Sequence, residues 1–116
     1  NHINVFGEEL MIENAEVALS KAAKAMKLNI VDYTAAPIFM KADKKGGHQW
    51  LIEFKSPPKN KQRFALLLDQ FLKEENSDYE AKRHKDMTLG LPKLDFANQN
   101  LFYNWMAQKK KHWRSG

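Results

Sequence analysis

The chain has 116 residues, of which 43% are hydrophobic and 28% are charged, and its formal net charge is +5. This length suits one domain with one core, and the composition is ordinary for a soluble globular fold. No apolar run approaches the roughly 18 residues of a membrane span, and no signal-peptide pattern opens the chain, so we expect a cytoplasmic protein. The absence of cysteine excludes disulfides, thiolate metal sites and thiol nucleophiles.

The N-terminal quarter predicts a helix after a short extended segment. Ile3 and Val5 alternate before Gly7, which indicates a short strand or the last part of an extended linker. The chain opens without Met, as though cut from something longer. A helix is predicted from about residue 13 to 27, because apolar residues recur at helical spacing: Met11, Ala15, Ala18, Leu19, Ala22, Ala25 and Met26. Its small alanines would let this helix lie close to a sheet.

A β-hairpin is the element around which the rest of the chain is organised. Its predicted arms are residues 29–40 and 47–55. Trp50, Ile52 and Phe54 alternate with other residues, which is the period-two pattern of a half-buried strand. The connector contains Gly46 and Gly47, and two glycines can take the positive φ that a reversal needs. The aromatic face of this hairpin requires helices packed over it.

Two helices are predicted after the hairpin. Ser56, followed by Pro57 and Pro58, predicts a helix start. The apolar residues of this helix fit the helical template throughout: Phe64, Leu67, Leu68, Phe71 and Leu72. Ser77 and Glu80 form a capping box, which predicts a short helix through about residue 85.

A strand and a last helix complete the chain. Leu89, Leu91, Leu94 and Phe96 indicate the strand, and Pro92 places it at an edge because proline cannot donate to a ladder. Asn98 predicts the cap of the helix, which carries one apolar side: Leu101, Phe102, Trp105 and Met106.

The predicted order is strand, helix, hairpin, helix, short helix, strand and helix. This order resembles a split β-α-β arrangement, with helices packed on one face of a small, mostly antiparallel sheet. The sequence therefore predicts an α+β fold, a two-layer sandwich, in a single domain that spans residues 1–116.

Side chains that commonly carry chemistry do not form a complete active site. No metal-ligand spacing links the four histidines, so we interpret them as single surface side chains: His2, His48, His84 and His112. Asp32 and Glu53 lie on strands that can pair, where two carboxylates could do acid–base work. Their apolar neighbours favour outward-facing charges instead. No nucleophile elbow surrounds a serine, and Gly46-Gly47 is too short for a phosphate loop, with no Gly-Lys-Ser/Thr after it.

Positive charge is concentrated in the second half of the chain. Residues 1–58 hold seven basic and seven acidic side chains, whereas residues 59–116 hold twelve basic and seven acidic ones. Much of the excess is in the C-terminal tail: Lys109, Lys110, Lys111 and Arg114. Such a tail can bind phosphates or nucleic acid, but cations also suit the negative end of a helix dipole. We favour a solvated helix end and expect no nucleic-acid partner, because no surface of stacking aromatics accompanies the tail.

Four segments, in order, carry a resemblance to a known family. Residues 4–10 read Asn-Val-Phe-Gly-Glu-Glu-Leu before a helix, and residues 31–35 read Val-Asp-Tyr-Thr-Ala. Residues 47–54 read Gly-His-Gln-Trp-Leu-Ile-Glu-Phe, and residues 94–106 form a predicted strand before an aromatic-rich helix. Together they resemble the small C-terminal domain of bacterial members of the auxin-responsive Gretchen Hagen family. Those proteins are acyl-acid amido synthetases of the adenylate-forming superfamily.

The resemblance implies a two-step reaction in a full-length enzyme that uses ATP and Mg²⁺. A small carboxylic acid and ATP give an acyl-adenylate and pyrophosphate, and the amine of an amino acid then attacks to form an amide. A large N-terminal domain of the same chain, the implied partner, carries most of the nucleotide and acyl-acid site. The small domain swings over it and excludes water from a reactive anhydride. By itself the small domain is expected to be inactive and to bind no cofactor or metal.

The resemblance also places a hinge between the two domains, at Asn4, Val5, Phe6, Gly7, Glu8 and Glu9. Gly7 can absorb backbone rotation, although the sequence alone favours a simple turn before the helix. No catalytic residue is transferred, because Lys109-Lys110-Lys111 does not match the family's basic Gln-x-Lys-x-Pro-Arg segment. Two other functions stay open: a free-standing, non-enzymatic binding module that uses the hairpin face or a groove beside it, and a domain that binds nucleic acid through the basic tail.

Overall fold

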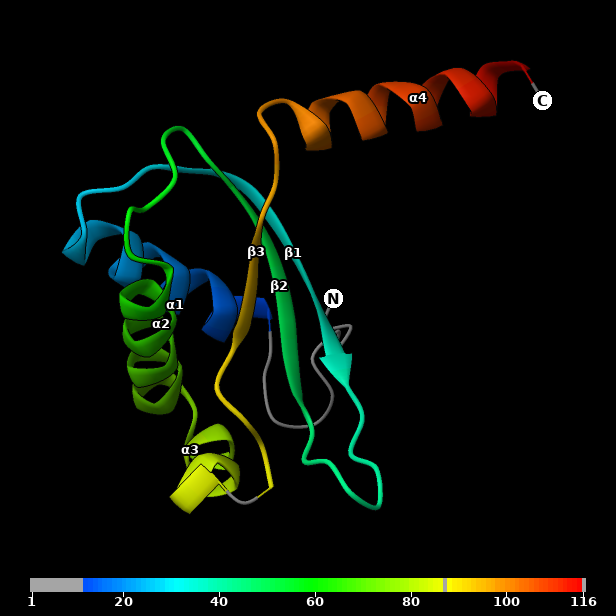
Figure 1. Cartoon of the computed structure of the whole chain (residues 1–116). Coiled ribbons are helices and arrows are strands. Elements are labelled where there is room, and N and C mark those ends of the chain that lie inside the picture. The colour runs from blue at the N-terminus through cyan, green and yellow to red at the C-terminus, as the bar shows by residue number, and fades with distance from the viewer. Residues whose placement is uncertain (1–11, 87, 116) are drawn as a thin grey trace.

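The computed structural model describes residues 12–86 and 88–115, and the side chains of residues 86 and 109–115 lie outside that description. Within those residues a three-stranded sheet carries α1 and α2 on one face (Figure 1). The elements in chain order are α1 (Ile12–Ala25), β1 (Ile30–Ile38), β2 (Gly47–Phe54), α2 (Lys61–Glu75), α3 (Ser77–Arg83), β3 (Lys93–Phe96) and α4 (Leu101–Ser115). The predicted α+β class is thereby confirmed. The strand predicted around Ile3 and Val5 lies outside the described residues.

β1 and β2 form the predicted antiparallel hairpin. Tyr33 lies opposite Ile52, and Ala35 lies opposite Trp50. The register shifts near the start of β1, between Ile30 and Asp32, where the ladder has an irregularity. Trp50, Ile52 and Phe54 are buried on the same face, as their alternation predicted.

The reversal of the hairpin lies at residues 41–44, and not at the two glycines. The Lys41 amide donates to the Lys44 carbonyl at 2.9 Å, and the Lys44 amide donates back at 3.2 Å. The predicted positive φ at Gly46 and Gly47 is wrong, because neither residue adopts it. Gly46 serves a different purpose, since a Cβ there would lie 3.0 Å from the backbone oxygen of Ile38.

β3 extends the sheet on the other side of β2 and runs parallel to it. Leu94 pairs with Trp50, and Phe96 pairs with Ile52. The strand order is β1-β2-β3, so β3 is an edge strand, as Pro92 predicted. It begins only at Lys93, so Leu89 and Leu91, which the prediction included, lie outside the strand. α2 and α3 form the crossover between the parallel strands. β2 and β3 are neighbours in the sheet. This β-α-β unit is therefore not of the predicted split type, in which a third strand lies between the two parallel strands.

The core lies between the sheet and the first two helices. Phe54 packs edge-to-face against Phe64 of α2 and against Phe96 of β3, with 5.2 Å between ring centroids in both pairs. The remaining buried apolar side chains of α2 follow the predicted helical spacing and include Leu68 and Leu72. The alanines of α1 are buried. The sequence predicted that they would let the helix lie close to the sheet, but they bring its backbone close to α2. A groove separates α1 from β1 instead.

Asparagines cap the two helices of the crossover, and both predicted serine caps are wrong. The Asn60 side chain accepts from the Arg63 amide at 3.0 Å, so α2 begins after Asn60 and not after Ser56. The Asn76 side chain accepts from the Tyr79 amide at 2.9 Å and starts α3, which makes Ser77 its first residue. Proline at two successive positions holds the chain extended after Ser56, whereas each asparagine stands directly before a helical run.

A buried ion pair joins α2 to α3. Arg83 donates to both carboxylate oxygens of Asp69, through Nε at 2.7 Å and a terminal nitrogen at 2.9 Å. Its other terminal nitrogen donates to the Leu89 carbonyl at 2.9 Å, and the Tyr79 hydroxyl donates to Asp69 at 2.7 Å. Asp69 and Arg83 are 4% and 8% exposed, so the pair is removed from water. Nothing in the sequence singled out these two residues, since they lie fourteen positions apart.

The pKa of Asp69 reflects two opposing effects. Burial alone raises the pKa of this carboxyl, but hydrogen bonds from Arg83 and Tyr79 and the nearby charges of Arg83 and Lys73 hold it below its ordinary value. For Tyr79, burial and the adjacent Asp69 charge raise the pKa far above its ordinary range. At neutral pH the cluster is therefore an ionised carboxylate held by a cation and a neutral phenol.

The substitution Asp69→Ala should lower the free energy of unfolding by about 3–5 kcal/mol, because it leaves the Arg83 charge buried without its carboxylate. Urea denaturation followed by circular dichroism measures this loss. Glu74→Ala is the matched control, an exposed carboxylate on the same helix, and should change stability by about 0.5 kcal/mol or less. Equal losses in the two variants would contradict a dominant role for the pair.

The stability contributed by Asp69 should also depend on pH. Because its folded-state pKa is lowered, this contribution is fully present above the unfolded-state pKa of about 3.9 and is lost as pH falls through the folded-state pKa. Urea denaturation from neutral pH down to acid should therefore show a smaller loss in Asp69→Asn than in the parent chain. If the free energy of unfolding fell equally with pH in the two proteins, Asp69 would not be the source of this pH dependence.

Candidate functional site

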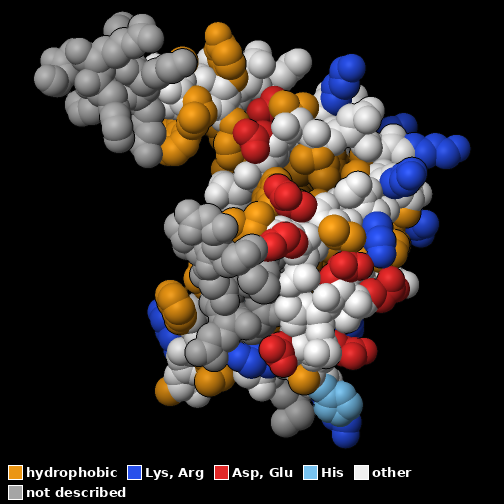
Figure 2. Space-filling model, turned by 180° about the vertical axis from the view of Figure 1, so that it is seen from behind, with side chains coloured by type: hydrophobic (Ala, Val, Ile, Leu, Met, Phe, Trp, Pro, Cys, Tyr) orange, Lys and Arg blue, Asp and Glu red, His pale blue; other side chains and the backbone are white. Residues whose placement is uncertain are grey.

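The last helix, α4, projects from the body of the domain (Figure 1). Its predicted apolar side is not buried against the sheet: Leu101 is 41% exposed and Met106 is 59% exposed. Tyr103, on the neighbouring side of α4, is 73% exposed. Figure 2 shows hydrophobic side chains on the surface of the described part of this helix. No helix within residues 12–86 and 88–115 has the length and apolar character needed to cross a bilayer. A projecting apolar helix is suited to contact another protein surface.

Glu53 anchors the start of α4. Its Oε2 accepts from the Asn100 amide at 2.9 Å, and Asn100 itself adopts a left-handed φ of 70°. The side chain is 3% exposed, so the predicted outward-facing charge is wrong. The segment after β3 folds over this position, with the Ala97 amide bonded to the Ile52 carbonyl at 2.8 Å. The predicted cap is also misplaced, because α4 begins at Leu101 and Asn98 supplies its backbone carbonyl to the Leu101 amide.

Asp32 and Glu53 lie opposite each other in the hairpin register, as their strands allowed. Asp32 is exposed, and its carboxylate accepts from the Tyr33 amide at 2.8 Å. Each carboxylate is therefore bonded to a different backbone amide. This arrangement supports structural roles for both residues and gives no geometric support for shared acid–base chemistry.

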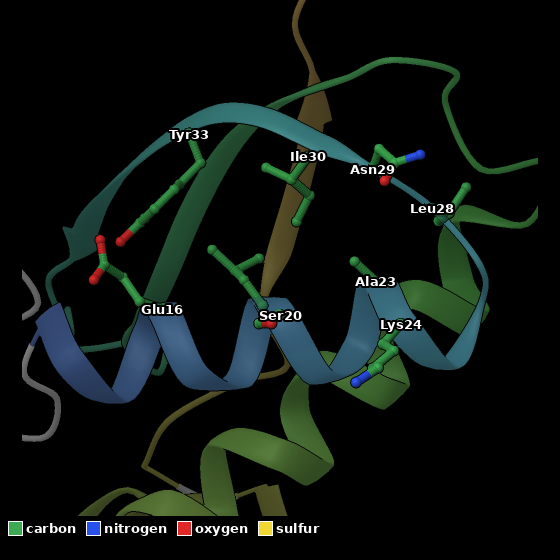
Figure 3. A pocket seen from close by; sticks show the side chains of 9 residues that line it. Glu16, Ser20, Ala23, Lys24, Leu28, Asn29, Ile30 and Tyr33 are labelled. Atoms are coloured by element: carbon green, nitrogen blue, oxygen red, sulfur yellow. The ribbon is translucent and has the colours of Figure 1, made fainter.

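A groove of about 450 Å³ separates α1 from β1. In Figure 3 the Tyr33 ring projects from β1 toward α1, and its hydroxyl lies near the Glu16 carboxylate. Leu19, Ala23 and Ile30 line the groove. Burial, followed by the charges of Glu16 and Asp32, raises the pKa of Tyr33 to about 12, so this phenol stays neutral at physiological pH. The groove therefore offers an apolar floor with a carboxylate and a hydroxyl at one end.

The histidines do not form a metal site in the part of the chain that is described. His48 is 1% exposed and stacks on Tyr79 at 6.1 Å, so the surface position predicted for it is wrong. His84 is exposed as predicted. No group of three potential metal-ligating side chains occurs among the described residues.

Three predicted features fall outside the described residues. The hinge at residues 4–9 precedes the first described residue, and so does His2. Residues 109–114 belong to α4, but the side chains of the basic tail, His112 included, lie outside the description. The candidate functional features among the described residues are thus the projecting helix α4, the α1–β1 groove and a basic pocket at the hairpin turn.

Comparison with protein families identifies one model, described as the GH3 family C-terminal domain, which matches residues 13–114. The matched range begins in α1 and ends in α4, so it includes every strand and helix described above. No curated protein matches the chain.

Replacing Glu53 should loosen the attachment of α4. Glu53→Ala leaves the Asn100 amide without its carboxylate partner, which should cost about 1–3 kcal/mol of unfolding free energy and speed hydrogen exchange at Asn100. Glu53→Gln keeps a side-chain oxygen that can accept, so its loss should be smaller. The control is Asp32→Ala on the facing strand, where exposure predicts a change of about 0.5 kcal/mol or less. Unchanged exchange at Asn100 in Glu53→Ala would contradict the anchoring role.

Proposed function

Because the chain belongs to the GH3 family, as its C-terminal domain, we propose that it is the mobile lid of an ATP-dependent acyl-acid amido synthetase. The polypeptide that carries it would first join a carboxylate to the α-phosphorus of ATP, which releases pyrophosphate and leaves an acyl-adenylate. The amine of an amino acid then attacks the acyl carbon, the bond from that carbon to the phosphate oxygen breaks, and AMP leaves as the amine loses a proton. The products are an amide and AMP.

The family match over residues 13–114 carries this proposal. The exposed apolar side of α4 supports it, because a lid needs a surface that becomes buried when it meets a second body. Leu101, Tyr103 and Met106 lie outside the core cluster and are between 41% and 73% exposed. In contrast, the side chains that face α2 and the sheet are closely packed. This division favours a rigid body in which α4 is an extended contact element, although Phe39 and Met40, just after β1, are exposed as well.

Lid closure has a clear physical purpose in such a reaction. An acyl-adenylate is a mixed anhydride that water hydrolyses, so a domain that covers it protects the intermediate until the amine arrives. Residues 4–9 are the proposed hinge, and Gly7 has the backbone freedom to absorb the rotation. ATP and Mg²⁺ would bind on the large domain in this proposal. Within residues 12–86 and 88–115 no cluster of metal-ligating side chains would hold Mg²⁺, and no step is assigned to a residue of this domain.

The full-length polypeptide provides the test. Purified protein should exchange pyrophosphate into ATP only when a suitable carboxylic acid is present, and it should form an amide with an amino acid, detected by mass spectrometry across a panel of acids and amines. A reading frame that starts just before Asn1, or the absence of acid-dependent exchange across the panel, would contradict the proposal. In either case a free-standing binding module would become the better explanation.

The contact role of α4 is testable in the same protein. The double substitution Tyr103→Ser and Met106→Ser should lower amide formation about tenfold, because two apolar contacts to the large domain are lost. The matched control is Leu66→Ser on α2, which removes a side chain that is 52% exposed on a different helix. Equal losses in both variants, or none in either, would contradict docking through α4.

A further inference from the structure

The largest described pocket that the lid proposal does not use lies at the turn of the hairpin. It has a volume of about 700 Å³, within the size range of small-molecule sites. Two segments that are far apart in the sequence form most of it, residues 43–47 and residues 90–93, and Ile38 completes the wall. We call it the hairpin-tip pocket.

Backbone hydrogen bonds fix the two sides of this pocket. The Gly46 amide donates to the Thr88 carbonyl at 3.0 Å, and the Gly90 amide donates to the Gly46 carbonyl at 2.9 Å. All three glycines that the structure describes line the pocket, so no Cβ narrows it at these positions. At Gly47 an added Cβ would meet no atom within 4 Å, which shows open space beside the backbone. The backbone hydrogen bonds therefore hold the two segments that form the pocket, and the lysine side chains line it.

The charge around the pocket is positive. Lys44, Lys45 and Lys93 line it together with a single carboxylate, Asp43. Neither Lys44 nor Lys93 forms an ion pair among the described residues, in contrast to Lys21 and Lys73, which do. Exposed lysines are ordinarily solvated, but here three of them line one concavity, and a Cβ at Gly90 would lie 3.4 Å from the Lys45 side chain. That arrangement favours a bound anion.

The remaining wall is apolar. Ile38, Leu91 and Pro92 are half-buried or buried, and each offers hydrocarbon surface to the pocket. A ligand that matches both parts has a compact negative head and an apolar or aromatic body. A dianionic head fits better than a single carboxylate, because both Lys44 and Lys93 line the pocket and their attraction grows with the charge of the ligand.

We propose that the hairpin-tip pocket binds a small organic phosphate, with its phosphate between Lys44 and Lys93 and its apolar body against Leu91 and Pro92. The site differs from a phosphate loop, since no helix N-terminus is involved and lysine side chains supply the charge. The inference does not depend on the lid function, because it uses only the pocket's own lining.

Three probes separate the contributions of charge and apolar surface. Phenyl phosphate carries a phosphate that is largely dianionic at pH 7.5 and an aromatic ring, benzoate carries the ring with one charge, and inorganic phosphate carries the charge alone. Titrations of the full 116-residue chain, followed by amide resonances in two-dimensional NMR, should shift Gly46, Gly47 and Gly90 with phenyl phosphate. Benzoate and inorganic phosphate should each bind about tenfold more weakly. Equal affinity for all three probes, or shifts confined to other residues, would overturn the proposal.

Charge-neutralising variants complete the test. The double variant Lys44→Gln and Lys93→Gln should weaken phenyl phosphate binding at least about tenfold, because two ammonium groups near the phosphate are lost. The matched control, Lys55→Gln with Lys59→Gln, makes the same change in net charge at exposed lysines that do not line the pocket. It should alter binding by about twofold or less. Similar weakening in both double variants would show general attraction by net charge and would overturn a specific site. The NMR spectra also report directly whether each variant is folded.

Discussion

The bidentate ion pair between Arg83 and Asp69 is the interaction on which one end of the domain depends, the end that contains α3 and the hairpin turn. It holds α3 against α2, and the remaining guanidinium nitrogen fixes the Leu89 carbonyl. Leu89 is also bonded through its amide to Lys82 and forms a bridge with Gly46 at the base of the hairpin turn. One buried cation therefore positions the crossover helices, the approach to β3 and the wall of the hairpin-tip pocket. A charge pair in this position requires complete hydrogen bonding, since an unmatched buried charge would be costly.

The opposite end of the sheet is organised around Glu53. A carboxylate near the end of a strand would ordinarily face water, but here it is covered and accepts from the backbone at the beginning of α4. The helix it anchors carries apolar side chains outside the core, whereas α1 and α2 bury most of theirs, with Val17 and Leu66 among the exposed ones. The domain thus combines a closely packed body with one projecting element. In the proposed enzyme, the body would move as a unit and α4 would supply contact with the large domain.

The two pockets offer different chemistry because they have different walls. The α1–β1 groove has the Glu16 carboxylate and the neutral phenol of Tyr33 at one end, and it lies where α1 approaches α2 more closely than the sheet. The hairpin-tip pocket has lysines and bare glycine backbone. An amphipathic anion suits the second, whereas the first is lined by one carboxylate, Glu16, and one lysine, Lys24, and so offers no net positive charge.

The sequence by itself determined the hairpin, the helices and the edge position of β3, because these depend on local periodicity and on what proline cannot do. It also carried the family resemblance, since short motifs are read residue by residue. Tertiary structure decided the rest. Asn60 and Asn76 replaced the serines as caps, and His48 and Glu53 became buried, because these outcomes depend on which distant segment covers a position. The Asp69–Arg83 pair and the lysine-lined pocket bring together residues that are distant in the sequence. Local sequence patterns contain no information about such long-range contacts.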